Sequence, residues 1–218
     1  MFSPQLSPDA ILFDDRADAA RQLAQLVLKE AQSIEAPFVV YALPRGGVGI
    51  GAEIAQALRC PLDIFVAKKI TRPNDPELAI GAVTADGHIL RSLNSRLPDW
   101  QEAVDRAQKK AKEQLEQFQE RPNVTATDKI ALLVDDGIAT GMTISVAAQA
   151  LREQHPREIW ICAPVAPAVL TKRLYDYCDR VLVLAAPDPF LSVSRFYRSF
   201  PQVEIETAIA DLKKTLQN

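Results

Sequence analysis

The sequence lacks the features that mark membrane, secreted and nucleic-acid-binding proteins. No apolar run reaches the roughly 20 residues of a membrane-spanning helix. The first residues, MFSPQ, show no basic segment followed by an apolar core, so we expect no signal peptide. The net charge of −3 gives no basic excess that would attract nucleic acid or an anionic membrane. These absences favour a cytoplasmic protein that binds neither nucleic acid nor membranes.

Cysteine is also scarce. Cys60, Cys162 and Cys178 are odd in number, widely spaced and form no Cys-x-x-Cys pair, which is typical of free thiols in a reducing compartment. No cluster of His, Cys and Asp has the spacing of zinc ligands. What remains is 218 residues with 48% hydrophobic and 24% charged side chains, the balance of a globular protein with one domain of ordinary size.

Short apolar runs alternate with stretches of helical periodicity. This alternation predicts an α/β fold with a mostly parallel central sheet flanked by helices. We expect strands at 38–43, 64–67, 130–134, 158–163 and 181–184, and a hairpin from 80–84 and 88–91 around Asp86-Gly87. We expect helices at 14–31, 52–58, 100–118, 144–151, 167–177 and 204–216.

Three loops follow expected strands and carry polar residues. They are residues 44–49, 68–78 and 135–143, and the segment 71–78, with two prolines and several charges, should be exposed and mobile. In open α/β sheets, ligands bind beyond the carboxyl ends of the strands. The three loops are therefore expected to meet at one ligand site.

The loop at 135–143 pairs two carboxylates with a phosphate-binding pattern. Asp135 and Asp136 end the apolar run 130–134, and a loop rich in Gly and Thr leads into the next helix. Backbone N–H groups of such a loop and of a helix N-terminus favour an anion, and Thr140 and Thr143 add hydroxyl donors. The carboxylates repel a phosphate, so they should face hydroxyl groups, a metal ion or both.

A second glycine loop suggests a second anion. Arg45 offers a planar donor fork in Pro44-Arg-Gly-Gly47. Lys68 and Lys69 add positive charge at a neighbouring strand end, and one of the two is expected to face the site. The loops together predict a ribose with phosphate at one end and a polyphosphate at the other, carrying Mg²⁺.

These residues resemble a known family. The stretch from Val134 to Thr143 (VDDGIATGMT) is similar to the phosphoribosyl pyrophosphate signature of the type I phosphoribosyltransferases. The stretch from Leu43 to Gly47 (LPRGG) resembles their pyrophosphate loop, which often contains a non-proline cis peptide, here expected around Arg45-Gly46. Residues 69–95 correspond to the mobile loop that closes the active site.

The resemblance also implies a domain plan. The chain 1–218 would form a single phosphoribosyltransferase domain with a core at about 13–186 and a mobile loop and hairpin at 69–95. The small hood that holds the base would come from 187–218, with the N-terminal arm 1–12 as a further candidate.

The activity implied is a Mg²⁺-dependent transfer of the 5-phosphoribosyl group from phosphoribosyl pyrophosphate to a nitrogenous base, with release of pyrophosphate. Asp135 and Asp136 would bind the ribose hydroxyls, directly or through Mg²⁺ held mainly by substrate oxygens. The catalytic residues implied are Asp135, Asp136, Arg45 and Lys68. The substrate-binding residues implied are Arg45, Gly46, Gly47, Lys68, Lys69, Asp135, Asp136, Ala139, Thr140, Gly141, Met142, Thr143, Val165, Phe190 and Tyr197. The family also commonly forms homodimers.

Two positions bear on the base. Ala139 stands where 6-oxopurine enzymes usually keep an acidic residue that handles the proton of the base, and Pro164-Val-Ala-Pro167 stands where they place a lysine. Both differences disfavour hypoxanthine and guanine, and the Ala-Thr-Gly form is closer to adenine-type enzymes. Phe190 and Tyr197 are candidates for stacking on the base, or for core or dimer contacts.

Other readings remain open. The main alternative is a non-catalytic regulator that senses phosphoribosyl pyrophosphate or a nucleotide with the same fold. A general dinucleotide-binding domain would need Gly-x-Gly-x-x-Gly, and the glycines at 47, 49 and 51 do not have that spacing. The acidic pair could also only stabilise its loop, and Arg45 could be a solvated turn residue.

Overall fold

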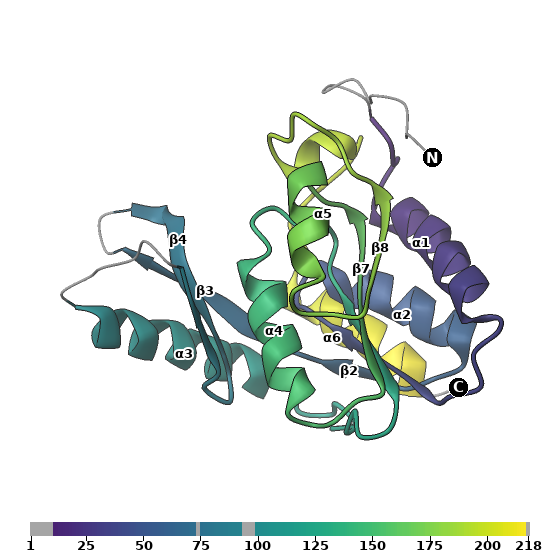
Figure 1. The fold of residues 1–218 in the computed structure, drawn as a ribbon, viewed down its shortest axis with the longest axis horizontal. Coiled ribbons are helices and arrows are strands. Elements are labelled where there is room, and N and C mark those ends of the chain that lie inside the picture. Colours follow the sequence, from purple (N-terminus) through teal and green to yellow (C-terminus); the bar gives the residue numbers. More distant parts are fainter. Residues whose placement is uncertain (1–10, 73–74, 93–98, 217–218) are drawn as a thin grey trace.

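A five-stranded parallel sheet forms the centre of the molecule (Figure 1). The computed structural model describes residues 11–72, 75–92 and 99–216. The strand order is β2-β1-β6-β7-β8, and the paired strands run parallel. The strands are β1 (Phe38–Ala42), β2 (Leu62–Ile64), β6 (Ile130–Val134), β7 (Glu158–Val165) and β8 (Arg180–Ala185). The predicted α/β fold class is confirmed.

The register of the two central strands brings two of the predicted loops together. β1 and β6 pair residue for residue, from Phe38 opposite Ile130 to Ala42 opposite Val134. Both strands therefore end at the same level of the sheet. The amide of Leu43 donates to the carbonyl of Val134 at 2.8 Å, which extends this pairing by one step into the loops.

Helices cover both faces of the sheet because successive strand residues point to opposite sides. Leu132 and Val134 of β6 pack towards α1 (Arg16–Ala31), α2 (Gly47–Leu58) and α6 (Ile205–Leu216). Ala131 and Leu133 pack towards α4 (Met142–Arg152) and α5 (Ala168–Leu174). All five residues of β6 are buried, as expected for a strand covered on both faces.

Helix α2 begins at Gly47, five residues before the expected start at Ala52. Glycine disfavours helices by about 1 kcal/mol relative to alanine, so the sequence pattern argued against an earlier start. Close packing on the sheet overrides this preference. A Cβ atom on Gly47 would lie 2.6 Å from the carbonyl oxygen of Val134, and one on Gly51 would lie 3.0 Å from the Cβ of Ala42.

A second, antiparallel sheet contains strands β3 (Ala67–Arg72), β4 (Asp75–Thr84) and β5 (Ile89–Arg91), with α3 (Trp100–Glu116) packed on it. In Figure 1 it projects to one side of the central sheet. The hairpin around Asp86-Gly87 is confirmed, with Gly87 at a φ of 102°.

Two expectations about this region were wrong. The run 64–67 is not one strand, because the chain leaves the parallel sheet after Ile64 and Ala67 pairs with Thr84 in the antiparallel sheet. No turn residue separates the two, so the sequence pattern could not locate the change. The segment 71–78 is mainly strand rather than loop. Residues 73–74, within the expected mobile segment, lie outside the described part.

The C-terminal region divides into two parts. A short 3₁₀ helix, η1 (Val193–Phe196), and the residues around it pack on the N-terminal segment, where Phe13 bridges to Tyr197. Helix α6 lies beside α2 on the central sheet, so residues 205–216 of the expected hood at 187–218 pack with the central core and not with the segment around η1. Residues 1–10 of the expected arm lie outside the described part. Among the described helices, none is long and apolar enough to cross a membrane.

Candidate active site

The loop after β1 and the loop after β6 touch at the carboxyl edge of the sheet. A Cβ atom on Gly46 would lie 1.9 Å from Oδ2 of Asp136. Only a glycine at this position lets the two loops approach so closely. A non-proline cis peptide joins Pro44 and Arg45, one bond before the expected position around Arg45-Gly46.

The two carboxylates of the acidic pair have different surroundings. Asp135 is half-buried, and its Oδ1 accepts from the amide of Asp136 at 2.8 Å. Burial, followed by the neighbouring charge of Asp136, raises the pKa of Asp135 well above its usual value. Asp136 instead accepts from Nε of Arg16 at 2.8 Å through Oδ2. The pair therefore combines a buried carboxyl group with an ion-paired carboxylate.

Arg16 is a site residue that sequence reasoning missed. It lies in the first turn of α1, 120 residues before its partner Asp136. Asp15 caps this helix by accepting from the amide of Asp18, which fixes where the helix begins. The only sequence signal was a cation at the start of a predicted helix, and such a residue is usually solvated.

The loop and helix start at 138–144 form an anion cradle. Within the described residues, no backbone hydrogen bond is donated by the amides of residues 139–143, whereas the flanking amides of Ile138 and Ser145 are both satisfied. Gly141 has a φ of 74° and caps α4 without a side-chain bond. Ala139 and Thr140 are exposed. Consecutive free N–H groups at a helix N-terminus provide the donors and the dipole that an anion needs.

Lys68 on β3 interacts electrostatically with two other cations. Burial, and then the positive charges of Arg45 and Lys110, lower the pKa of Lys68. Lys110, on α3, was also missed by sequence reasoning, because its helix follows the antiparallel sheet. Lys69 is the next residue on β3, so its side chain points to the opposite face of that strand, where it is exposed. Arg45 contacts Glu204 at 3.9 Å.

Residues 190–200, here called the aromatic tail, pack on the loop that carries Asp135 and Asp136. The hydroxyl of Tyr197 donates to the carbonyl oxygen of Asp136 at 2.7 Å, and burial raises the pKa of this tyrosine. Phe190 stacks on Phe196, with ring centroids 5.5 Å apart. A Cβ atom on Gly137 would lie 2.3 Å from Val193, which shows how closely this tail packs on the loop.

Three predicted substrate-binding side chains are engaged within the fold. Val165 ends β7 and is fully buried with Phe196 and Tyr197. Tyr197 is itself 5% exposed and packs between Phe13 and Phe200. Phe190 is half-buried. Phe200 is linked to the acidic pair through Arg16, whose guanidinium carbon lies 3.6 Å from its ring centroid.

The donor set suits Mg²⁺ bound together with a phosphorylated ligand. Among the described residues, no group of three or more His, Cys, Asp or Glu side chains could hold a metal by itself. Asp135 and Asp136 offer two adjacent carboxylates, which fits an ion that takes one or two carboxylates and completes its shell with water and phosphate oxygens.

Comparisons with known proteins identify the family of the chain. The family model "Phosphoribosyl transferase domain" matches residues 12–197. A protein of Mycobacterium tuberculosis H37Rv, "Putative phosphoribosyl transferase Rv0571c", is 38% identical over 212 residues, which cover 93% of this chain and 47% of that protein. Its counterpart in strain CDC 1551, MT0597, matches equally well. The chain thus spans about half the length of these curated relatives.

Two solved structures have folds similar to that of this chain. TT1426 from Thermus thermophilus is 30% identical, with a TM-score of 0.77 over 93% of this chain and 98% of that one. The AQ2163 protein of Aquifex aeolicus has a TM-score of 0.50 at 14% identity, covers 84% of this chain and 85% of that one, and supports the fold alone. With the acidic pair and anion cradle at the carboxyl edge of the sheet, the family match over 12–197 shows that the chain belongs to the phosphoribosyl transferase family.

Proposed function

We propose that the protein transfers the 5-phosphoribosyl group from phosphoribosyl pyrophosphate to a nitrogen atom of a base. The observation that carries this proposal is the set of free amides at 139–143, directly after the carboxylates of Asp135 and Asp136. The amides suit the 5-phosphate, and the carboxylates suit the ribose hydroxyls. Both ends of a ribose 5-phosphate are therefore matched within one loop.

The cationic side chains would bind the pyrophosphate leaving group. The bond between the anomeric carbon and the pyrophosphate oxygen breaks, and its electron pair leaves with pyrophosphate. A bond from the anomeric carbon to the acceptor nitrogen forms, and that nitrogen loses its proton. Arg45, Lys68 and Lys110 would stabilise the charge that develops on pyrophosphate. An anion bound among them also relieves their mutual repulsion, which is one cause of the lowered pKa of Lys68.

Asp135 and Asp136 would hold Mg²⁺ together with the donor. When bound, the ion supplies positive charge at the ribose hydroxyls and the pyrophosphate oxygens. The carboxylates orient the ribose, and the amide cradle fixes its phosphate. Positioning of this kind is a major source of rate enhancement when the transition state resembles an oxocarbenium ion.

We propose an acceptor other than a 6-oxopurine. Ala139 is exposed at the position where those enzymes keep an acidic residue. Its methyl group cannot exchange a proton with the base. The alternative function is a regulator that binds the same donor without turnover. One observation supports this alternative. The Asp136 carboxylate already forms an ion pair with Arg16, so it is less free to bind Mg²⁺ for catalysis.

Calorimetry with Mg²⁺ and phosphoribosyl pyrophosphate tests the donor site, and pyrophosphate release with a panel of nucleobases tests turnover. We expect binding and turnover with at least one base that is not a 6-oxopurine. Binding without turnover for every base would favour the regulator. Absence of binding at millimolar donor would refute both.

The double variant Asp135→Asn, Asp136→Asn tests the ribose role. We expect donor affinity to fall on the order of 10- to 100-fold, because charge-assisted hydrogen bonds to the hydroxyls are weakened. The melting temperature should change little, because the relief of repulsion between the two carboxylates offsets the weakened ion pair between Asp136 and Arg16. Asp176→Asn, at an exposed position, is the matched control. Equal affinity of the double variant and the control would contradict the assigned role.

A further inference from the structure

Arg16 joins three parts of the molecule at the acidic pair. Its Nε donates to Oδ2 of Asp136 at 2.8 Å, its Nη1 donates to the carbonyl oxygen of Pro201 at 2.6 Å, and its guanidinium stacks on Phe200. We propose that Arg16 is a positioning residue of phosphoribosyl transfer, which fixes the Asp136 carboxylate for the ribose and ties it to the aromatic tail. This inference rests on the proposed function.

The first step concerns the orientation of the Asp136 carboxylate. Oδ2 faces both Arg16 and the backbone of Gly46, where an added Cβ would lie only 1.9 Å away. Within the described ranges, no hydrogen bond reaches Oδ1 of Asp136. The contacts therefore immobilise one oxygen and leave the other available to accept from a ribose hydroxyl. A carboxylate without Arg16 would rotate more freely about its Cβ–Cγ bond.

The second step concerns the environment of the ion pair. The side chains of Arg16 and Asp136 are only 18% and 17% exposed. Water screens such a pair less than it screens a surface pair, so the guanidinium is a persistent partner. Its planar fork also makes two directed bonds while one face lies on an aromatic ring. A lysine could supply the charge but neither this fork nor the stacked plane.

The third step links the ion pair to the tail. Phe200 packs on Tyr197, with ring centroids 4.6 Å apart, and Tyr197 donates to the backbone carbonyl of Asp136. Asp136 is therefore held twice from the same tail, once at its backbone by Tyr197 and once at its side chain through Arg16. A change in the tail on acceptor binding would reach the ribose site by this route.

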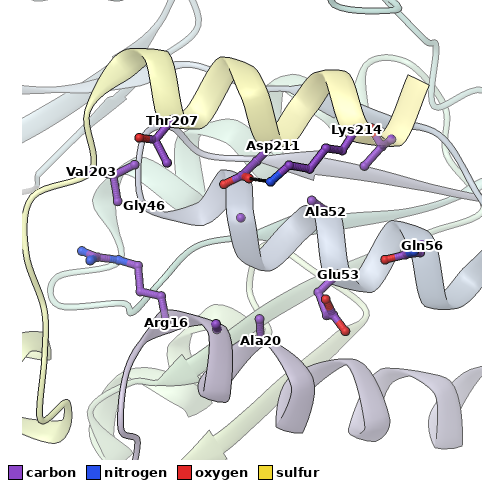
Figure 2. A pocket seen from close by; sticks show the side chains of 13 residues that line it. Arg16, Ala20, Gly46, Ala52, Glu53, Gln56, Val203, Thr207, Asp211 and Lys214 are labelled. Atoms are coloured by element: carbon purple, nitrogen blue, oxygen red, sulfur yellow. Dashed lines mark hydrogen bonds and ion pairs between the residues drawn. The ribbon is translucent and has the colours of Figure 1, made fainter. Parts of the chain in front are cut away.

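A groove beside Arg16 makes the proposal testable by chemical rescue. It has a volume of ≈ 680 Å³ between α1, α2 and α6, and Arg16 and Gly46 lie at the same end of it (Figure 2). The floor contains small residues, among them Ala20, Gly49 and Ala52. A free guanidinium ion can therefore reach the space that an Arg16→Ala substitution would open.

The experiment compares Arg16→Ala, Arg16→Lys and the control Arg21→Ala. Arg21 lies on the same helix, is 60% exposed and contacts Asp18 at 3.5 Å. We expect Arg16→Ala to raise the Kd and the KM for the donor on the order of 10- to 100-fold, the range of a charge-assisted hydrogen bond, with a smaller change in kcat. Arg16→Lys should recover part of the affinity, and Arg21→Ala should behave as the wild type.

Chemical rescue separates positioning from a structural role. Millimolar guanidinium should restore donor affinity in Arg16→Ala and leave Arg21→Ala unchanged. A purely structural residue would lower the melting temperature, and guanidinium would not restore donor affinity.

The outcomes distinguish this proposal from the proposed function. If the wild type binds and turns over the donor and Arg16→Ala does so with unchanged Kd and KM, the role of Arg16 is refuted and the function stands. If the wild type binds no donor, the proposed function fails first and takes this inference with it. If Arg16→Ala does not fold, Arg16→Lys and Phe200→Leu decide: a donor Kd and KM equal to those of the wild type in both variants would overturn the proposal.

Discussion

At the scale of single residues, the site depends on space as much as on charge. Gly46 has a φ of −63° and a ψ of −33°, which any residue can adopt. Its backbone conformation therefore does not require glycine. What requires glycine is the Asp136 carboxylate, whose Oδ2 occupies the place of a Cβ atom. The loop after β1 and the acidic pair are thus coupled by direct contact.

Gly46→Ala tests this coupling. The new methyl group must displace Asp136 or the loop, so we expect donor affinity to fall about tenfold or more, the effect of losing roughly 1.4 kcal/mol of binding free energy. Gly49→Ala is the matched control, because its Cβ would meet only the movable end of Asp211 at 3.2 Å. Calorimetry with Mg²⁺ and the donor provides the comparison. Equal affinity of the two variants would contradict the coupling.

At the scale of elements, the antiparallel sheet is tied to the central domain by an ionic contact. His88, beside β5, donates from Nε2 to Glu153 at the end of α4 at 2.9 Å. Its Nδ1 lies 3.3 Å from Asp86 but without hydrogen-bond geometry. The hydrogen bond to Glu153 is the main cause that raises the pKa of His88 above its ordinary 6.5.

The stability contributed by this contact should depend on pH. Because the pKa is raised in the folded state, the contribution is fully present below about 6.5 and is lost as pH rises through the folded value. Relative to Glu153→Gln, the wild type should be more stable at about pH 5.5 by up to about 1 kcal/mol, and the difference should vanish at about pH 8.5. Urea denaturation at both pH values measures it.

Glu113→Gln serves as the control for this comparison, because Glu113 pairs with Lys109 on the exposed face of α3 and no histidine is involved. Its effect on stability should be the same at both pH values. A difference between wild type and Glu153→Gln that did not change with pH would show that His88 is not the titrating partner.

At the scale of the whole molecule, the protein combines a large core with a smaller one. The central sheet is buried on both faces, whereas the antiparallel sheet relies on a separate cluster that includes Ile70, Val83 and Val104. Figure 1 shows this sheet and α3 projecting beyond the central domain. Lys68, whose pKa is lowered in part by the charge of Arg45, lies on β3 of this smaller unit. Donor binding should therefore stabilise the smaller unit.

Hydrogen exchange followed by mass spectrometry tests this expectation. Without donor, amides of β3, β4 and α3 should exchange faster than those of β6 and β7, since fewer buried contacts hold them. With Mg²⁺ and phosphoribosyl pyrophosphate, exchange should slow in β3 as well as in 135–143. The double variant of Asp135 and Asp136 should lose this protection. Protection restricted to 135–143 would show that the smaller unit does not take part in binding.

Predictions from the sequence agree with the structure where a feature depends on residues close together in the chain, and they fail where it depends on distant residues. Four strands of the central sheet (β1, β6, β7 and β8), the hairpin at Asp86-Gly87 and the helix after the loop 135–143 were predicted, because consecutive residues encode them. The boundary between β2 and β3 and the first turn of α2 were not. In both cases packing against distant elements decided the outcome over local propensity.

The sequence by itself determined the α/β fold and the places of the two glycine-containing loops, because hydrophobic periodicity and loops rich in Gly and Thr act over a few residues. Only the tertiary structure decided the partner of Asp136. Arg16 lies 120 residues away in the chain, at the start of α1. Side chains on separate elements come into contact only when those elements pack together. The spacing of residues along the sequence does not predict such contacts.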